Sequence, residues 1–274
     1  MSKVFYIADL HFGHKNIIRY DNRPFKTVEE MDKALIERWN RAVSKEDFVF
    51  ILGDISWYDD EKTADIFEQL NGTKVIVRGN HDNIKPNTRL ARCFSGTQSY
   101  YEYYYNKKNK VIMCHYPIPC FKNHFYGWFH LCGHTHISFE HNMMENDKFE
   151  IKALYDRPCN MYNVGCMHPW MNYTPRTLSE IISGYEQYLA STKPEEQVEA
   201  GGLRPCPYCG GSDIRYSIKS TTLQFKKAYH ASMYCWDCNS YGPRVLYKSD
   251  EHRYDVEHNE NLRKQAESLW NRRG

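Results

Sequence analysis

The chain has 274 residues, a length that allows one large domain or two unequal ones with real cores. The formal net charge of +2 shows that the chain is not a polyelectrolyte. Charge alone therefore indicates no partner. No apolar run approaches the ~20 residues of a membrane span, and the opening residues show no signal-peptide pattern. We therefore expect a cytoplasmic protein without a membrane partner.

Apolar runs that end in polar residues recur along the first part of the chain. Residues 4–8 read as a buried strand that ends in Asp9 and His11, which alternation along an extended chain places on the same side. Residues 47–52 form a second such run, which ends in Asp54. A carboxylate and an imidazole placed in this way can reach one cation.

A third apolar run, residues 75–77, leads to the sequence Gly-Asn-His-Asp at residues 79–82. Glycine and asparagine after a strand mark a turn at the carboxyl edge of a sheet, where open α/β sheets bind ligands. Asn80, His81 and Asp82 offer an amide oxygen, an imidazole and a carboxylate, which suit a metal-assisted hydrolytic site. Helices are predicted over 29–43 and 62–70, so strands alternate with helices as in α/β proteins.

The next segment predicts a hairpin, with strands at 99–105 and 110–113 joined by a turn at 106–109. Its second strand leads to His115, and the apolar run 128–132 leads to a Gly-His-Thr-His sequence that contains His134 and His136. A short strand at 161–164 follows. Thr177 and Glu180 form a capping box, which predicts a helix from there to about residue 189.

The ordered set Asp-x-His, Gly-Asp, Gly-Asn-His-Asp, His and Gly-His-x-His resembles the signature of the calcineurin-like metallophosphoesterase superfamily. The resemblance covers about residues 3–190 and implies an α/β fold with two stacked mixed β-sheets flanked by helices. It also implies two divalent cations, for which oxygen and imidazole ligands favour Mn, Fe or Zn. The implied ligands are Asp9, His11 and His136 for the first cation, Asn80, His115 and His134 for the second, and Asp54 as the bridge between them.

The same resemblance implies a hydrolase in which two cations clamp a phosphate and activate a water molecule. His81 would face the substrate phosphate and Asp82 would orient it, while His14 and His168 are possible substrate contacts. The protein Ser/Thr phosphatases of the superfamily carry Gly-Asp-x-Val-Asp-Arg-Gly and Gly-Asn-His-Glu. This chain has Gly-Asp-Ile-Ser-Trp-Tyr and Gly-Asn-His-Asp instead, which disfavours a protein substrate.

We therefore expect a phosphodiesterase acting on a nucleotide or a nucleic acid. Two alternatives stay open at this stage. One is a phosphomonoesterase with a small substrate. The other is a binding protein in which the C-terminal module recruits nucleic acid or a host factor and the large domain is a scaffold.

Residues 191–202 are polar and contain proline and glycine, which predicts a linker between a domain at 1–190 and a module at 203–274. Within that module, two tight cysteine pairs at two-residue spacing predict a closed, tetrahedral, structural zinc site. A hairpin is expected between the pairs and a helix from about 259 to 273. The zinc ligands would be Cys206, Cys209, Cys235 and Cys238.

The module at about 203–274 resembles the restriction alleviation protein family, small zinc-ribbon proteins often found in phages. The features that carry the resemblance are Cys-Pro-x-Cys-Gly-Gly, then Cys-x-x-Cys, then a terminal Trp-Asn-Arg-Arg helix. It implies a phage-related origin and, for a phage-encoded chain, the host cytoplasm. The module has 12 Lys and Arg against 8 Asp and Glu, too small a surplus to separate nucleic-acid contact from protein contact.

Overall fold

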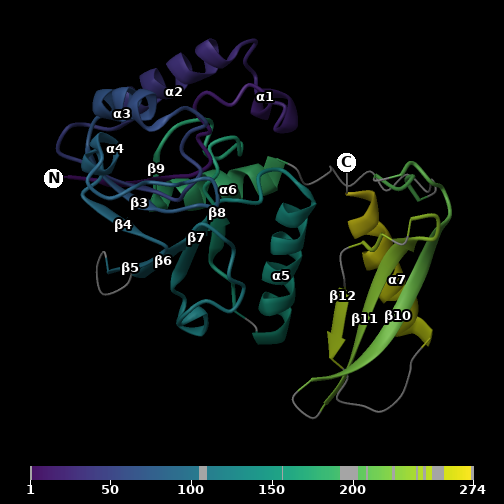
Figure 1. Ribbon diagram of the computed structural model, residues 1–274. Helices are drawn as coiled ribbons and strands as arrows, with labels where there is room; N and C mark the ends of the chain where they lie inside the picture. The colour runs from purple at the N-terminus through teal and green to yellow at the C-terminus, as the bar shows by residue number, and fades with distance from the viewer. Residues whose placement is uncertain are drawn as a thin grey trace. The chain divides into compact units, whose positions relative to one another are not determined.

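A computed structural model describes most of the chain, namely residues 2–104, 110–155, 157–191, 203–207, 209–223, 226–238, 240–242, 245–248 and 256–272. The chain divides into two compact units, Met1–Ala190 and Ser191–Gly274 (Figure 1). The predicted turn at 106–109 lies outside the described residues, as does all of the predicted linker after Ser191.

The first unit contains a five-stranded sheet. Its strands are β1 (Val4–Ile7), β2 (Phe48–Ile51), β3 (Thr73–Val77), β4 (Gly96–Gln98) and β9 (Arg176–Thr177). Their order is β4-β3-β2-β1-β9, with β1 to β4 parallel to their neighbours and β9 antiparallel to β1. The carboxyl ends of the parallel strands therefore meet at one edge, as the recurrent strand-end residues predicted.

The second sheet of this unit has four strands in the order β5-β6-β7-β8. They are β5 (Tyr100–Tyr104), β6 (Lys110–Cys114), β7 (Phe129–Cys132) and β8 (Met161–Asn163). The predicted hairpin is present, because β5 and β6 pair antiparallel with Tyr100 opposite Cys114. The remaining pairs are parallel, so this sheet is also mixed.

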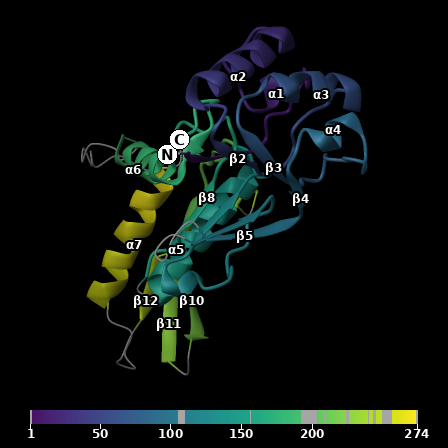
Figure 2. The ribbon, with the colours of Figure 1, turned by 90° about the vertical axis from the view of Figure 1, so that its left-hand side faces the viewer.

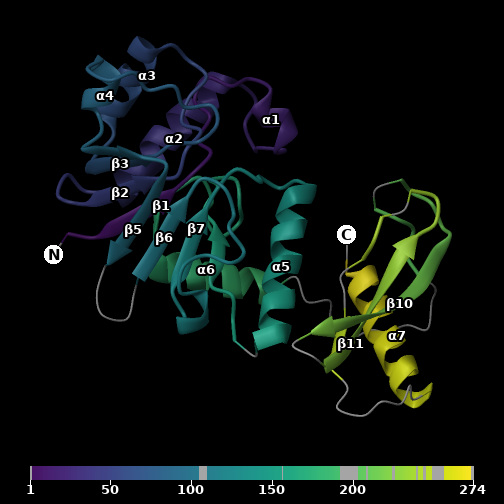
Figure 3. The same cartoon turned by 60° about the horizontal axis from the view of Figure 1, so that its bottom comes forward.

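Alternation along β6 shows how the two sheets are stacked. Val111 and Met113 belong to the main core with the first sheet, whereas Ile112 belongs to a smaller core on the opposite face. Because successive side chains of a strand point to opposite faces, β6 is covered on both sides. The predicted fold, two stacked mixed sheets flanked by helices, is confirmed (Figure 3).

Helices flank the two sheets. They are α1 (Ile17–Tyr20), α2 (Val28–Ala42), α3 (Asp60–Gln69), α4 (Arg89–Arg92), α5 (Phe139–Tyr155) and α6 (Leu178–Ser191), with a 3-10 turn at His124–Tyr126. The helices α2 and α3 lie on the face of the first sheet that is turned away from the second (Figure 2). Met31, Leu35 and Trp39 of α2 are buried there at helical spacing. No helix within the described residues is long and apolar enough to cross a membrane.

The second unit has a three-stranded antiparallel sheet and one helix. The elements are β10 (Ile214–Leu223), β11 (Lys226–Cys235), β12 (Val245–Lys248) and α7 (Val256–Asn271). The strands β10 and β11 pair from Ile214–Cys235 to Leu223–Lys226, which is the hairpin expected between the cysteine pairs. Its small core contains Met233 and Trp270, and Trp270 donates its indole N–H to the Arg204 carbonyl at 2.8 Å.

Candidate metal centre

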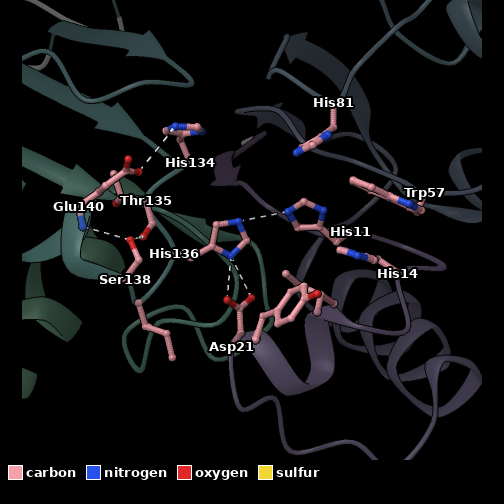
Figure 4. A pocket seen from close by; sticks show the side chains of 13 residues that line it. His11, His14, Asp21, Trp57, His81, His134, Thr135, His136, Ser138 and Glu140 are labelled. Atoms are coloured by element: carbon pink, nitrogen blue, oxygen red, sulfur yellow. Dashed lines mark hydrogen bonds and ion pairs between the residues drawn. The ribbon is translucent and has the colours of Figure 1, made fainter. Parts of the chain in front are cut away.

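The metal ligands predicted for the first unit follow strands of both sheets. Asp9 and His11 come after β1, Asp54 after β2, Asn80 after β3, His115 after β6, and His134 and His136 after β7. The two sheets are joined next to the first of these turns, because Ala8 forms a parallel bridge with Gly165. Residues from separate parts of the chain therefore converge at one place (Figure 4).

A first set of donors surrounds one point. Its members, whose ligand atoms all lie within 4.8 Å of one another, are Asp9, His11, Asp54 and His136. The Nε2 atoms of His11 and His136 are 3.2 Å apart, and the His136 Nε2 is 3.9 Å from the Asp9 carboxylate. Two carboxylates and two imidazole nitrogens that face each other, with little exposure to water, fit a divalent cation.

A second set of donors adjoins the first. Asn80 Oδ1 lies 3.1 Å from His115 Nε2 and 3.0 Å from His134 Nδ1. His115 Nε2 is in turn 3.5 Å from Asp54 Oδ2, and that same oxygen is 3.8 Å from His11 Nε2. The Asp54 carboxylate thus stands between the two sets, and these donors can hold a second cation beside the first.

The charges of the centre are set by burial and by close pairing. Burial, followed by the neighbouring positive groups, lowers the pKa of His11 to about 2, so this imidazole is neutral and available as a ligand. Burial raises the pKa of Asp54, but the hydrogen bond and charge of His115 outweigh it and lower the pKa to about 2. Burial lowers the pKa of His115, whereas Asp54 and Asp9 raise it to about 9. A cation would take the place of the proton that His115 holds.

The backbone of these turns is strained. Five of the predicted ligands are non-glycine residues with a left-handed backbone: Asp9 (φ 55°), His11 (φ 51°), Asp54 (φ 54°), His134 (φ 70°) and His136 (φ 46°). Such conformations cost of order 1–3 kcal/mol each and gather at functional sites. The fold maintains them because the surrounding strands determine the path of the chain.

Glycines let these turns approach closely. A Cβ atom on Gly53, whose φ is +87°, would lie 2.5 Å from His115 Nδ1. A Cβ atom on Gly79 would overlap Asp54 Oδ1. The turns after β2 and β3 can therefore meet only because both positions lack a side chain.

The structure shows which groups the Asp82 carboxylate contacts. It accepts three backbone N–H groups, from Gly79 at 2.7 Å, Asp54 at 2.8 Å and Ile55 at 3.0 Å. An ionised carboxylate has the acceptor capacity for several such bonds. Asp82 thus fastens the turn after β3 to the turn after β2.

A cavity of about 590 Å³ opens beside the two sets of donors, within the size range of small-molecule sites. His81 lines it, and its backbone N–H donates to Asp54 Oδ1 at 3.0 Å. His14 also lines the cavity, as the sequence allowed. The lining residues are His11, His14, Ile17, Tyr20, Asp21, Trp57, His81, His134, Thr135, His136, Ile137, Ser138 and Glu140.

His168 differs from its predicted role as a possible substrate contact. Its side chain is only 1% exposed and does not line the cavity. Its ring is stacked on Trp170 with a centroid separation of 4.4 Å. Burial also lowers its pKa well below the ordinary value, as expected for a neutral imidazole in a core.

Two residues that the sequence did not indicate support the first set of donors. His136 Nδ1 donates to the two Asp21 carboxylate oxygens at 2.9 and 3.0 Å, which leaves Nε2 facing Asp9. Arg23 bonds the same carboxylate at 2.9 Å and donates to the Asp9 carbonyl at 2.9 Å. A carboxylate behind a metal-binding histidine fixes its tautomer and its orientation.

We expect Asp21→Asn to weaken binding of one Mn²⁺ by about 10- to 100-fold, because the amide keeps the shape but loses the charge that orients His136. Isothermal titration of the metal-free chain with Mn²⁺ measures this affinity. Asp47→Asn is the matched control, since Asp47 is also a buried carboxylate. It precedes β2 and so lies at the end of this strand away from the metal centre. Equal affinities for Asp21→Asn and the native chain would show that Asp21 does not position His136.

The four cysteines of the second unit also converge, with their sulfur atoms within 4.8 Å of one another. The Cys206–Cys238 and Cys209–Cys235 sulfur pairs are each 3.6 Å apart. Four sulfurs about 2.3 Å from a tetrahedral zinc ion would be about 3.8 Å apart. Hydrogen bonds from Ser240 lower the pKa of Cys238 to about 6, which favours the thiolate. The group therefore fits the structural zinc site of a zinc ribbon.

Comparisons with known proteins show the family to which the chain belongs. A family model described as calcineurin-like phosphoesterase matches residues 2–197. An uncharacterized protein of Methanocaldococcus jannaschii is 39% identical over 140 residues, 50% of this chain and 72% of that protein. The Gene 66 protein of Mycobacterium phage L5 is 35% identical over 99 residues, 35% of this chain and 47% of that protein.

A crystal structure of a protein of unknown function from Aquifex aeolicus shares the fold. It has a TM-score of 0.50 and 22% identity, and the match covers 67% of this chain and 99% of that one. Two stacked mixed sheets with Asp and His side chains clustered at their edges, together with the family match, indicate a metal-dependent phosphohydrolase. The chain belongs to the calcineurin-like phosphoesterase family, which confirms the resemblance of its first 190 residues. The likeness of residues 203–274 to restriction alleviation proteins stays a prediction.

Proposed function

We propose that the chain is a phosphodiesterase that hydrolyses an ester of a nucleotide or a nucleic acid. The observation that carries this proposal is Asp54, shared by two sets of donors beside a cavity that His81 lines. When bound, two divalent cations would neutralise the phosphoryl oxygens and lower the pKa of a water molecule. The donors are oxygens and imidazole nitrogens without thiolate, which favours Mn, Fe or Zn.

The residues of the proposed centre then have distinct parts in the proposed reaction. Asp9 and Asp54 bring negative charge, while His11, His115, His134 and His136 bring neutral imidazole nitrogens once a cation has replaced the proton on His115. His81 belongs to neither set of donors, and it lines the cavity next to His11, with the two ring centroids 6.0 Å apart. Its ring would hydrogen-bond a phosphoryl oxygen or give a proton to the leaving oxygen.

The lining of the cavity favours a diester over a monoester. None of its lining residues, among those that the structure describes, is lysine or arginine, whereas Asp21 and Glu140 are both present. A phosphomonoester carries about −1.5 to −2 charges near pH 7, and a diester carries only one. Asp21 is already paired with Arg23, so the extra charge of a monoester would lie near Glu140 with no lysine or arginine in the described lining to balance it.

Turnover of bis-p-nitrophenyl phosphate and of p-nitrophenyl phosphate, each with Mn²⁺, tests this choice. We expect kcat/KM for the diester to exceed that for the monoester by about tenfold or more, a difference of roughly 1.4 kcal/mol in barrier. A preference for the monoester would favour the alternative, a phosphomonoesterase with a small substrate.

We expect His81→Ala to lower kcat on the diester by about a hundredfold while the chain still binds two Mn²⁺ ions, because only charge stabilisation is lost. Asn80→Ala should lower turnover as much and also lose bound metal, because Asn80 is a donor of the second set. Steady-state kinetics and metal analysis of both variants separate these effects. Native kinetics in both variants would contradict the assignment of this site.

We also propose that residues 203–274 form a separate zinc-ribbon domain, joined through residues 191–202, that contacts nucleic acid or protein. In its described part, Trp236 is 53% exposed, and the Arg215 guanidinium lies 4.0 Å from its ring centroid. Such a pair can stack on a base or on a protein side chain. The phage relatives support a site of action in the cytoplasm of a host cell.

A further inference from the structure

Aromatic rings that are not assigned as metal ligands form one side of the cavity. The rings of Trp57 and His14 are stacked with a centroid separation of 4.2 Å and an interplanar angle of 9°. His81 lies 4.6 Å from Trp57, and Tyr20 meets His14 edge-on at 6.2 Å. Figure 4 shows His14, Trp57 and His81 together on one side of His11.

These rings remain accessible to a ligand. Trp57 is 49% exposed and Tyr20 is 60% exposed, whereas Trp39, a core tryptophan of the same unit, is 1% exposed. Both exposed rings line the cavity. Large aromatic surfaces left in a cavity beside a reactive centre suit a planar partner that can cover them.

The position of Trp57 is fixed relative to the metal ligands. Its backbone N–H donates to the Phe12 carbonyl at 2.7 Å, and Phe12 pairs with Ser56 in a parallel bridge. Phe12 directly follows His11, and the ring centroids of His11 and Trp57 are 6.0 Å apart. The pentose of a nucleotide can span such a separation, so a phosphate at the centre would place a base near Trp57 without rearrangement of the loop.

We propose that Trp57, supported from behind by His14, stacks a nucleobase of the substrate and so selects nucleoside phosphodiesters. This proposal rests on the proposed phosphodiesterase function. Arg19, whose guanidinium lies 5.3 Å from the Tyr20 ring centroid, places a cation beside the second exposed ring. An aromatic platform with a neighbouring cation is the arrangement that binds single-stranded nucleic acid through its bases and its backbone.

Two diesters that share a leaving group test the proposal, the p-nitrophenyl ester of thymidine 5′-phosphate and methyl p-nitrophenyl phosphate. The ratio of their kcat/KM values is expected to fall roughly 5- to 150-fold in Trp57→Ala, which corresponds to base stacking of about 1–3 kcal/mol. The loss should appear mainly in KM for the thymidine ester. Trp57→Phe should restore most of the ratio, and Tyr126→Ala, which removes a ring 78% exposed outside the cavity, should leave it unchanged.

An unchanged ratio in Trp57→Ala would overturn the proposal, whether both activities fall together or neither falls. If the native chain hydrolyses neither ester, the proposed phosphodiesterase function fails instead. The stacking proposal is then judged by equilibrium binding of the dinucleotide thymidylyl-thymidine with Mn²⁺ present. Trp57→Ala must weaken that binding by the same factor, and equal affinities would overturn it.

Discussion

Asp54→Asn is expected to lower turnover of a phosphodiester by roughly a thousandfold or more. Loss of a residue that only supports a metal ligand already lowers metal affinity or activity by about 10- to 100-fold. Asp54 lies between the two sets of donors. Its Oδ2 is 3.8 Å from His11 Nε2 and 3.5 Å from His115 Nε2. The amide keeps the size of the side chain but removes the negative charge that two adjacent cations would share.

Hydrolysis of bis-p-nitrophenyl phosphate, together with the number of Mn²⁺ ions bound per chain, measures this effect. The variant should bind fewer than two ions and keep its circular dichroism spectrum. Asp65→Asn serves as the control, because Asp65 is an exposed carboxylate whose partner is Arg89 on the surface. The bridging role would be excluded if Asp54→Asn bound two ions and hydrolysed the ester at the native rate.

Cys235→Ser is expected to unfold the second unit. Structural zinc sites contribute about 10–16 kcal/mol at pH 7, and the apolar core described in this unit is small. Its buried members are Cys206, Ala231, Met233, Cys235, Val245, Leu262, Ala266 and Trp270. Without the fourth thiolate the ion is held weakly, and this core cannot offset the conformational entropy of the strands around it.

Hydrogen exchange of the backbone amides in β10 and β11 measures this loss of structure, and zinc content is measured on the same sample. Protection should vanish in the second unit and persist in β1 to β3 of the first, because the two units are separately compact. Cys120→Ser, which replaces an exposed thiol of the first unit, should change neither. Native protection in the Cys235→Ser hairpin would show that zinc is not required.

The convergence of the strand-end side chains could be predicted from the sequence, because each group of them directly follows an apolar strand. Apolar runs such as Phe48–Ile51 identify buried parallel strands, and the carboxyl ends of such strands meet at one edge. Polar residues directly after them are therefore close in space although far apart in sequence. The convergence of the two cysteine pairs could also be predicted, since the two-residue spacing within each pair lets both of its thiolates bind one tetrahedral ion.

Other features could not be predicted because they depend on tertiary contacts. Asp82 stands next to His81 in sequence, yet its carboxylate turns back to three backbone N–H groups. Asp21 follows the short helix α1 rather than a strand, so no pattern marked it as the partner of His136. The helix α5 was missed because its sequence is rich in polar residues and buries mainly Met144 and Ile151.

The central claim is that side chains from five separate turns hold two neighbouring cations. Anomalous diffraction from crystals grown with Mn²⁺ tests it most directly. We expect two peaks roughly 3.5–4 Å apart, one among the donors of Asp9, His11 and His136, the other among those of Asn80, His115 and His134, with Asp54 contacting both. A single peak, or peaks away from Asp54, would contradict the account.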